Sequence, residues 1–488
     1  MWILRLVASA LFLLALPGLA LPRPVTSDLA RLTAQRHLLD QPGHGQGWSI
    51  QDVDATPSGL AHVVRLSPTG YVVVSADERL PPVLAYSRQA GFGALDPALN
   101  PLLDLIEADL AGRKAHLELV AEPVRRARRA EWQRLRTGAA REGERTDYWP
   151  PEGSTSTGGW IEVRWGQGAP YNAFCPLDAV SGNRSVAGCP AVAMAQLLTL
   201  HRDTRGTRFE AGDRYYHNYG GNQYWIDDAW ESYDFPRFPD LNTHLDTLDA
   251  HWAAGTSLTV TDKAALVFAC GVAARQVYHP QGSGTFGVNQ AFTAWQRFGY
   301  GEARLLGPSN AAVYSILAQN MMNGHPAHLA VVTPTWNAGH NVVVDGWNSD
   351  GFFHLNFGWG GPYDGWYLLP DEMPYNLTVL EGVIVDLIPQ ETSLPPRRER
   401  QPQWALAAWP NPCNPLLTLS FDLALPGQVE LDLLNLLGQR VATLHQGMLG
   451  AGRHHLPWTP VVASGVYLAR LRHLDTGAQA IRRVVVAK

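Results

Sequence analysis

The sequence predicts a chain of the α+β class in three parts: an α+β N-terminal unit, a mixed central domain and an all-β C-terminal sandwich. Three observations lead to this prediction. An apolar run after Gly188 is typical of a buried helix, residues 339–369 contain two strand-like runs, and the residues after 404 alternate apolar and polar side chains through short strands. At 488 residues the chain is long enough for about three domains.

Residues 1–20 are predicted to be a secretory signal peptide. An apolar run from Leu6 to Leu16 is followed by Gly18 and Ala20, small residues that suit cleavage near Ala20. The run is shorter than the roughly 18 residues that a membrane span needs, so export is preferred to a membrane anchor. We therefore expect a secreted protein, or one attached to the cell surface, without an integral membrane span.

Residues 21–121 are predicted to form a separate α+β unit. Apolar and polar residues alternate over residues 58–87 around a turn at Pro68-Thr69-Gly70, which predicts a hairpin followed by another strand. Residues 100–120 carry apolar side chains at near-helical spacing and predict a helix. Taken by itself, this pattern is that of an ordinary α+β domain.

Residues 122–157 are predicted to be a linker that is rich in arginine and ends in a Gly/Ser/Thr-rich stretch, residues 152–159. Proteases cut exposed and poorly packed chain, so activation by cleavage in this linker is our hypothesis. The alternative is that the arginines form the solvated face of a helix that continues the preceding one.

Residues 158–390 are predicted to form the central domain, whose main feature is AGCPAVAMAQLLTLH (Ala187–His201). This run predicts a helix that is buried on most of its circumference, with Cys189 at its N-terminus. The unpaired N–H groups and the dipole of a helix N-terminus favour the thiolate, which is the nucleophilic form of cysteine. Pro190 fits because a first-turn residue needs no N–H donor. A small apolar cysteine at a helix start is the alternative interpretation.

A second stretch, residues 339–369, supplies further polar candidates. His340 precedes a β-branched run, and Asn356 ends the next strand-like run. A cysteine followed by a distant histidine and then an asparagine is the chain order of one kind of thiol-dependent site. Imidazole can take the thiol proton and later protonate the leaving amine, and a side-chain amide can hold the ring in its productive orientation.

The stretches AGCPAVAMAQLLTLH, WGQGAPYN (Trp165–Asn172) and GHNVVVDG with FHLNFGWGG together resemble the streptopain-type cysteine peptidases, a family with a papain-like fold. The resemblance implies that Cys189 is the nucleophile, His340 the general base, Gln167 the oxyanion-hole amide and Asn356 the residue that orients the histidine. It implies no cofactor and no metal. The chain departs from the family at Phe357, where tryptophan is usual, and at Pro190, where a valine-like residue is common.

The same resemblance implies which residues bind substrate. The small-residue loop after Gln281 contributes Ser283 and Gly284. Gly339 and Trp359, beside the histidine and the asparagine, complete the predicted substrate-binding set. Loops with few side chains suit an extended peptide that is bound through its main chain. A plain connection between helices is the alternative for the loop, and packing is the alternative for the tryptophan.

Other residues that could carry chemistry have simpler interpretations. Cys175 is a rival nucleophile, but it precedes Pro176, which favours extended backbone over a helix start. His354 is expected to be a packed strand residue and Asp345 a turn residue. The four cysteines leave one disulfide possible, and their spacing has no zinc pattern.

The phrase GYVVVSADERLPPVLAYS, within residues 21–121, resembles the inhibitory prodomain of the same peptidases. After a Pro/Arg linker at residues 391–403, residues 404–488 predict an all-β, immunoglobulin-like sandwich. This sandwich resembles the C-terminal sorting domains of exported bacterial proteins, which are related to flagellar-hook-capping modules. The segments that carry this resemblance are Pro410–Pro415, Leu437–Val441 and Ser464–Tyr467. It implies bacterial secretion machinery as a partner.

The net charge of −6, with 17% charged residues, gives no reason to expect a nucleic-acid partner. The sequence therefore predicts a secreted cysteine endopeptidase, made as a zymogen, that acts on protein or peptide substrates and is inhibited by its own prodomain. Two alternatives stay open. The chain could be a catalytically silent papain-fold binding or adhesion protein, or a cysteine-dependent amidase or transferase.

Overall fold

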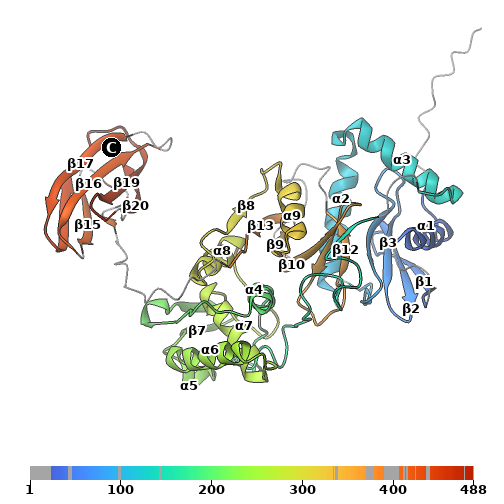
Figure 1. Cartoon of the computed structure of the whole chain (residues 1–488), viewed down its shortest axis with the longest axis horizontal. Coiled ribbons are helices and arrows are strands. Elements are labelled where there is room, and N and C mark those ends of the chain that lie inside the picture. Colours follow the sequence, from blue (N-terminus) through green and yellow to red (C-terminus); the bar gives the residue numbers. More distant parts are fainter. Residues whose placement is uncertain are drawn as a thin grey trace, which may run out of the picture. The chain divides into compact units, whose positions relative to one another are not determined.

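The computed structural model divides into two compact units, Met1–Gln390 and Glu391–Lys488 (Figure 1). It describes residues 24–41, 47–96, 100–141, 146–333, 335, 339–369, 379–389, 406–409, 411, 413, 416–423, 425–435, 440–476 and 479–486. The predicted signal peptide and the predicted 391–403 linker lie outside these residues. No helix among the described residues is long and apolar enough to cross a membrane.

One antiparallel sheet of 11 strands runs through the first unit. Its order is β1-β2-β3-β4-β12-β11-β10-β9-β13-β8, and β5 pairs with β10 off this path. The strands are β1 Ser49–Ala55, β2 Ala61–Ser67, β3 Tyr71–Ser75, β4 Val83–Ser87, β5 Tyr148–Trp149, β8 Arg304–Leu306, β9 Ala327–Val332, β10 Gly339–Asn348, β11 Phe352–Asn356, β12 Gly365–Leu368 and β13 Leu380–Val385. A separate hairpin pairs β6 (Tyr216–Tyr219) with β7 (Asn222–Trp225).

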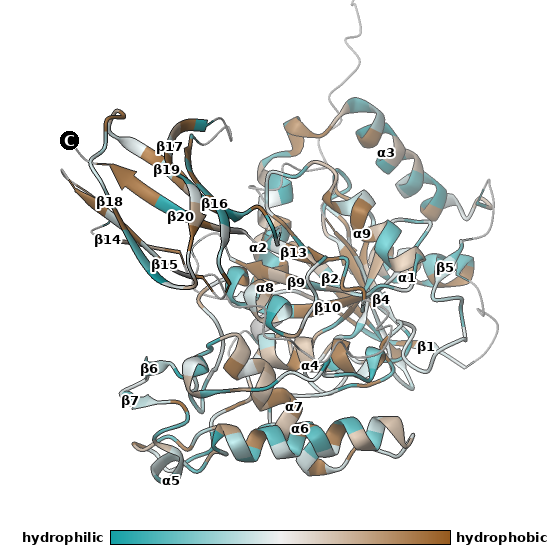
Figure 2. Ribbon diagram, turned by 60° about the vertical axis from the view of Figure 1, so that its left-hand side comes forward, coloured by the Kyte–Doolittle hydropathy of each residue, from teal (hydrophilic) through white to brown (hydrophobic). Residues whose placement is uncertain are grey.

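Helices cover the sheet of the first unit. They are α1 Ser27–Asp40, α2 Pro101–Ala115, α3 Glu122–Thr137, α4 Cys189–His201, α5 Trp230–Tyr233, α6 Phe238–Ala253, α7 Val260–Ala273, α8 Val288–Arg297 and α9 Val313–Met322, with short 3₁₀ turns at Leu117–Leu119 and Ala211–Asp213. The buried helix predicted after Gly188 is confirmed as α4. The helix α6 is two-faced: its buried residues recur every three or four positions, and Figure 2 shows hydrophilic and hydrophobic residues side by side along it.

The central strands are buried on both faces because they separate two hydrophobic cores. Val343 of β10 belongs to the core built around α4 and α7. Its neighbours Val342 and Val344 belong to the core on the other face, which includes residues of α9 and α2. Side chains of a strand alternate between faces, so even-numbered and odd-numbered residues at the start of β10 point to opposite sides of the sheet.

The N-terminal region predicted as a separate unit continues the sheet of the central domain. Its last strand, β4, pairs with β12 through Tyr86 with Trp366 and Ala85 with Tyr367. Strand edges present unpaired N–H and C=O groups, and this pairing satisfies them for both partners. We call this junction the seam.

The arginine-rich segment differs from the predicted open linker, because residues 122–137 form the packed helix α3. Its Trp132 and Leu135 are buried, and the Trp132 indole N–H donates to the Leu80 carbonyl at 2.9 Å. Of its arginines, Arg126 and Arg129 are exposed, Arg128 is buried and the others are half-buried, and pairs such as Glu131–Arg134 support the helix. The alternative interpretation is right in that the segment is helical, but α3 is separate from α2, which ends at Ala115, and its Arg128 is buried.

The second unit consists of a three-stranded sheet, β14-β15-β18, and a four-stranded sheet, β17-β16-β19-β20. The strands are β14 Ala407–Trp409, β15 Leu417–Leu423, β16 Gly427–Leu434, β17 Arg440–Leu449, β18 Gly452–Trp458, β19 Gly465–His473 and β20 Gln479–Val486. Alternate residues from both sheets, including Leu419, Leu431 and Leu471, share one core. Two sheets that share one core confirm the predicted all-β sandwich. Pro410, Pro412 and residues 414–415 and 437–439 of the sorting resemblance lie outside the described residues.

Candidate active site

Cys189 is the first residue of α4, as predicted, and Pro190 follows it in the first turn. Gly188 precedes the helix with φ of 84°, a conformation that favours glycine. A Cβ at this position would lie 2.7 Å from Oε1 of the buried Gln276. The Gln276 side chain also donates to the Ala187 carbonyl at 2.7 Å. The segment before the cysteine is thus held in place by an amide that the sequence analysis did not single out.

The environment of the Cys189 sulfur differs from the prediction. Burial raises the pKa of the thiol, although hydrogen bonds from Asn341 act in the opposite direction. The Asn341 side-chain amide donates to Sγ at 3.8 Å. The expectation of an acidic thiol is therefore wrong for the intact chain, because the cost of burying a charged sulfur exceeds the help of the helix N-terminus.

Asn341 is itself held by a buried histidine. The Trp295 indole N–H donates to Nδ1 of His328 at 3.3 Å, so Nε2 of this histidine carries the proton and donates to Oδ1 of Asn341 at 2.7 Å. Burial lowers the pKa of His328 to about 4, which keeps the ring neutral. These bonds orient the Asn341 amide so that its N–H groups face Cys189.

His340 lies on β10 next to Asn341 but on the opposite face of the strand. Its Nε2–H donates to the Phe357 carbonyl at 2.7 Å, and its ring stacks on Trp359 with centroids 4.3 Å apart. Burial lowers the pKa of His340 to about 4. Within the part of the chain that the structure describes, no hydrogen bond joins His340 to Cys189. Nucleophile and base are therefore neutral and unpaired with each other in the intact chain.

Among the described residues, no hydrogen bond joins the Asn356 side chain to His340 in the intact chain. Its side chain exchanges hydrogen bonds with Gln196 at 3.0 and 3.2 Å and donates to the Val163 carbonyl at 3.0 Å. The group that holds His340 is instead the main-chain carbonyl of Phe357, one residue further on. Asn356 faces α4, so its amide orients the segment that holds the histidine and not the ring itself.

Gln196 was missed by the sequence analysis. This fully buried residue of α4 accepts from the Trp165 N–H at 2.9 Å and pairs with Asn356. It therefore connects three segments, namely the helix of Cys189, the segment before Gln167 and the strand end beside His340. A signal was present, because Gln196 is the one amide in the otherwise apolar run AVAMAQLL.

Gln167 lies beside the segment that leads into α4, the helix that begins with Cys189. Its main-chain carbonyl accepts from the Ala187 N–H at 2.8 Å, which places it beside the residues that lead into Cys189. The side chain is half-buried. Nearby, the Gly360 N–H donates to the Trp165 carbonyl at 2.9 Å. The glycine-rich turn that follows β11, the strand paired with β10, therefore closes the same side of the site.

Three of the predicted substrate-binding residues lie near the two predicted reacting groups. The Ser283 carbonyl is 3.1 Å from the position of a Cβ on Gly188, and Gly284 packs beside Pro190. Trp359 covers the His340 ring. The fourth, Gly339, begins β10 opposite Val332 and is exposed.

The other cysteines are free and buried. Burial raises the pKa of Cys175 and of Cys270, so neither thiol is poised to react. Burial raises the pKa of the Cys189 thiol as well, but Cys189 as a residue is only partly buried. This favours Cys189 over Cys175 as the nucleophile.

Two regions of the chain are similar to known protein families. Residues 165–367 match the Peptidase C10 family, and residues 22–109 match the Spi protease inhibitor family. The two matched regions are similar to a streptopain-type cysteine peptidase and to its inhibitory prodomain. It is 25% identical to the thiol protease/hemagglutinin PrtT of Porphyromonas gingivalis over 311 residues, which cover 62% of this chain and 32% of PrtT. It is 23% identical to streptopain of Streptococcus pyogenes over 329 residues, which cover 63% of this chain and 73% of streptopain.

Solved structures are also similar to the chain. A fragment of prointerpain A from Prevotella intermedia matches with a TM-score of 0.46 and 20% identity, covering 70% of this chain and 99% of that fragment. Active interpain A from the same organism matches with a TM-score of 0.35 and 24% identity, covering 47% of this chain and 94% of that protein.

In the C10 domain, a buried carboxylate lies behind the histidine. Asp364 accepts from the Phe357 N–H at 2.9 Å, on the peptide group next to the carbonyl that holds His340. Burial raises the pKa of Asp364 to about 7. The sequence analysis missed this residue, because an aspartate in a glycine-rich turn is most often a turn former.

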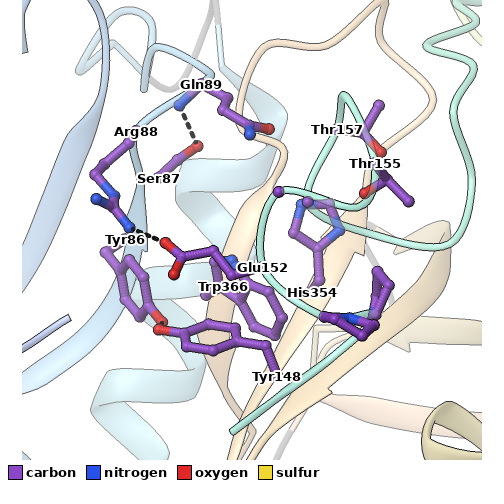
Figure 3. Close-up of a pocket in the computed structure, with 14 residues that line it drawn as sticks. Tyr86, Ser87, Arg88, Gln89, Tyr148, Glu152, Thr155, Thr157, His354 and Trp366 are labelled. Atoms are coloured by element: carbon purple, nitrogen blue, oxygen red, sulfur yellow. Dashed lines mark hydrogen bonds and ion pairs between the residues drawn. The ribbon is translucent and has the colours of Figure 1, made fainter. Parts of the chain in front are cut away.

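A cavity opens at the seam between the Spi-type prodomain and the C10 domain. Figure 3 shows Tyr86, Ser87 and Gln89 of the prodomain across from His354 and Trp366 of the C10 domain. The His354 Nδ1–H donates to Asp345 at 2.6 Å, and both side chains are buried. Asp345 also accepts from the Ile161 N–H at 3.0 Å, so it is a buried anchor within β10 and not the predicted turn residue.

Proposed function

We propose that this chain is a cysteine endopeptidase made as a zymogen. Cys189 attacks the scissile carbonyl, and the Gln167 amide with the Cys189 N–H stabilises the developing oxyanion. His340 accepts the thiol proton, delivers it to the leaving amine and then activates the water that hydrolyses the acyl-thioester. The observation that carries the proposal is the set of bonds of Gln196 on α4, the helix of Cys189. Gln196 bonds to Trp165, two residues before Gln167, and to Asn356, which directly precedes the Phe357 whose carbonyl binds His340.

The intact chain is the latent form in this proposal. Asn341 occupies the side of β10 that faces the sulfur, and His340 is bound to Phe357. Catalysis requires the start of β10 to rotate so that the imidazole replaces the amide beside Cys189. The prodomain pairs with β12, and β5 of the following segment pairs with β10 at Trp347 and Asn348. Removal of both would free the strands that position His340.

Activation by cleavage is part of the proposal, and the packing of α3 restricts where the cut occurs. Residues 122–137 are held in a docked helix, so we expect the cut between Gly138 and Gly158. N-terminal sequencing of the active form tests this. An active form that still begins near Leu21 contradicts the zymogen.

The decisive test of function is casein hydrolysis by the matured protein. The wild type is expected to hydrolyse casein, and both Cys189→Ala and His340→Ala are expected to lose more than about 1,000-fold of that activity. Cys175→Ala is the matched control, because this cysteine is fully buried in the same domain and should be dispensable. Hydrolysis that survives Cys189→Ala refutes the assignment.

A catalytically silent binding protein is the second candidate, because Asn341 and not His340 contacts the sulfur. In that case casein would stay intact, and iodoacetamide would not label Cys189 faster than the buried Cys270. A cysteine-dependent amidase or transferase would instead prefer free amides to peptides in a substrate comparison.

We also propose export through the signal peptide at residues 1–20 and sorting through the C-terminal sandwich. The support is that Glu391–Lys488 form a compact unit with its own core. Deleting residues 404–488 is expected to leave casein hydrolysis unchanged while the protein is no longer delivered to the cell surface or medium. Normal delivery of the truncated protein would contradict the sorting role.

A further inference from the structure

A cluster of exposed apolar side chains stands beside the candidate active site. Val180, Tyr219 and Phe286 are 77%, 41% and 72% exposed, and we call them the aromatic ledge. The rings of Tyr219 and Phe286 meet edge to face with centroids 6.4 Å apart. Val180 lies 3.8 Å from the position of a Cβ on Gly221, at the tip of the same hairpin as Tyr219. Three segments distant in sequence thus present one apolar surface.

Hydrogen bonds fix the backbone that carries the ledge, although the side chains of the ledge face solvent. The buried His217 of β6 donates from Nδ1 to the Asn222 carbonyl at 3.2 Å and accepts from the Tyr278 N–H at 2.9 Å. The Asn222 side chain accepts from the Ala179 N–H at 3.0 Å. The Phe286 N–H donates to Gln290 at 2.8 Å. Side chains held on fixed backbone lose little conformational freedom when a ligand covers them.

Contacts connect the ledge to the nucleophile. The Tyr219 ring packs edge to face on His279, with centroids 6.0 Å apart. The His279 carbonyl accepts from the Val186 N–H at 3.3 Å, three residues before Cys189. Ser283 accepts from the His279 N–H at 2.9 Å, and its carbonyl lies beside Gly188. A peptide that extends from the sulfur over Ser283 and Gly284 therefore reaches the ledge within a few residues.

We propose that the aromatic ledge binds a large apolar side chain of an extended peptide substrate and so sets the sequence preference of the enzyme. This inference rests on the proposed peptidase function. Open space beside Gly282 leaves the main chain of the loop accessible to a peptide backbone. Clustered aromatic rings gain from burial against an apolar partner, whereas exposed apolar clusters of this kind are uncommon on surfaces without a ligand. The ledge is exposed with the prodomain in place, so the prodomain does not occupy it.

The test uses full-length protein that has matured, with internally quenched peptides varied at one position at a time among Ser, Leu and Phe. The wild type is expected to prefer Leu or Phe to Ser by about tenfold in kcat/KM at one position near the scissile bond. Phe286→Ser and Tyr219→Ser are expected to reduce that preference to about twofold or less while cleavage of the Ser peptide is retained.

Trp225→Ser is the matched control. This tryptophan is 49% exposed on the same hairpin, but it pairs with Tyr216 at the end away from the tip. Its loss is expected to leave the preference unchanged. A wild type without apolar preference at any position overturns the inference, as does a Phe286→Ser variant with wild-type preference. A wild type that cleaves no peptide overturns the proposed function as well, which separates the two failures.

Discussion

Gln196 joins the helix of Cys189 to the segment before Gln167 and to the end of β11, next to the Phe357 carbonyl that binds His340, through bonds that are all buried. A buried amide that makes both donor and acceptor bonds fixes geometry, because any displacement leaves a polar group unpaired. We therefore regard Gln196 as a positioning residue for the proposed chemistry, and Asn356 as its partner.

Gln196→Leu is expected to lower kcat by up to about 100-fold with little change in KM, because displacement of reacting groups by about 1 Å has effects of this size. Gln196→Glu keeps the acceptor for Trp165 and should recover part of the loss. Both are read from steady-state kinetics of matured protein, with melting curves as a check on folding. Equal losses in the two variants would indicate a purely structural role.

Cys189 is expected to react slowly with iodoacetamide in the intact chain at pH 7, because burial raises the pKa of its thiol. After the prodomain is removed, we expect labelling to accelerate at least about tenfold as the imidazole replaces Asn341. Mass spectrometry of the labelled peptide measures the rate, and His340→Ala provides the control that should show no acceleration. Fast labelling of the intact chain would show that the latent arrangement is absent in solution.

At the scale of elements, the seam is held by more than main-chain pairing. The Tyr71 hydroxyl donates to the Tyr363 carbonyl at 2.7 Å and lies 2.7 Å from the Tyr367 hydroxyl. Arg113 of α2 donates to the Leu368 carbonyl at 2.6 Å. The prodomain is therefore joined to the same strand and turn that lie behind the His340 ring.

Tyr71→Phe removes a buried hydroxyl from the seam without changing the shape of the side chain. A hydrogen bond of this kind contributes roughly 1 kcal/mol, so the intact chain should mature about fivefold faster. Gel analysis of the conversion over time measures this rate. Tyr467→Phe is the control, because that hydroxyl donates to Ala463 at 3.0 Å within the second unit and should not affect maturation. An unchanged rate for Tyr71→Phe would mean that release of the prodomain does not limit maturation.

Several elements could be predicted from sequence because their signals are local. Cys189 opens α4 as its Gly188 and Pro190 neighbours predicted, and the loop around Ser283 leads to a helix, α8. The helix of the arginine-rich segment was only the alternative interpretation, because its many arginines hide the few apolar residues, Trp132 and Leu135, that it buries. The pairing of β4 with β12 joins residues nearly 300 positions apart, for which one sequence carries no pairwise signal.

At the scale of the whole molecule, the three-part α+β organisation was predicted from the sequence. The pairing of the site's side chains with one another in the intact chain was not predicted. Composition and periodicity report which residues are buried, so the mixed domain and the all-β sandwich could be recognised. The partner of a side chain depends on strand register instead. Whether residue 340 or 341 faces Cys189 is decided by alternation along β10 and by the His328 bond to Asn341, and neither is visible in the sequence.

The whole chain should lose stability in mild acid because of its buried histidines. Burial lowers the pKa of His37, His201, His328 and His340 from 6.5 to about 4. As pH falls from 6.5 towards 4, the unfolded chain takes up protons that the folded chain excludes, so folding free energy is lost across this window. A pKa shift of this size corresponds to a loss of at most roughly 3 kcal/mol of folding free energy for each fully buried ring. Asp364, whose pKa is raised to about 7, and Asp249, whose pKa burial also raises, act in the opposite direction.

We therefore expect the melting temperature of the full-length Cys189→Ala protein, which cannot process itself, to fall steeply between pH 6.5 and 4. Scanning calorimetry over this range measures the slope. His37→Leu removes one of five rings with a lowered pKa, since burial also lowers the pKa of His217, and should reduce the slope by roughly a fifth, whatever its effect on stability at neutral pH. A melting temperature that stays level from pH 6.5 to 4 would mean that these rings are hydrated in solution, and the latent packing of His340 would then be in question.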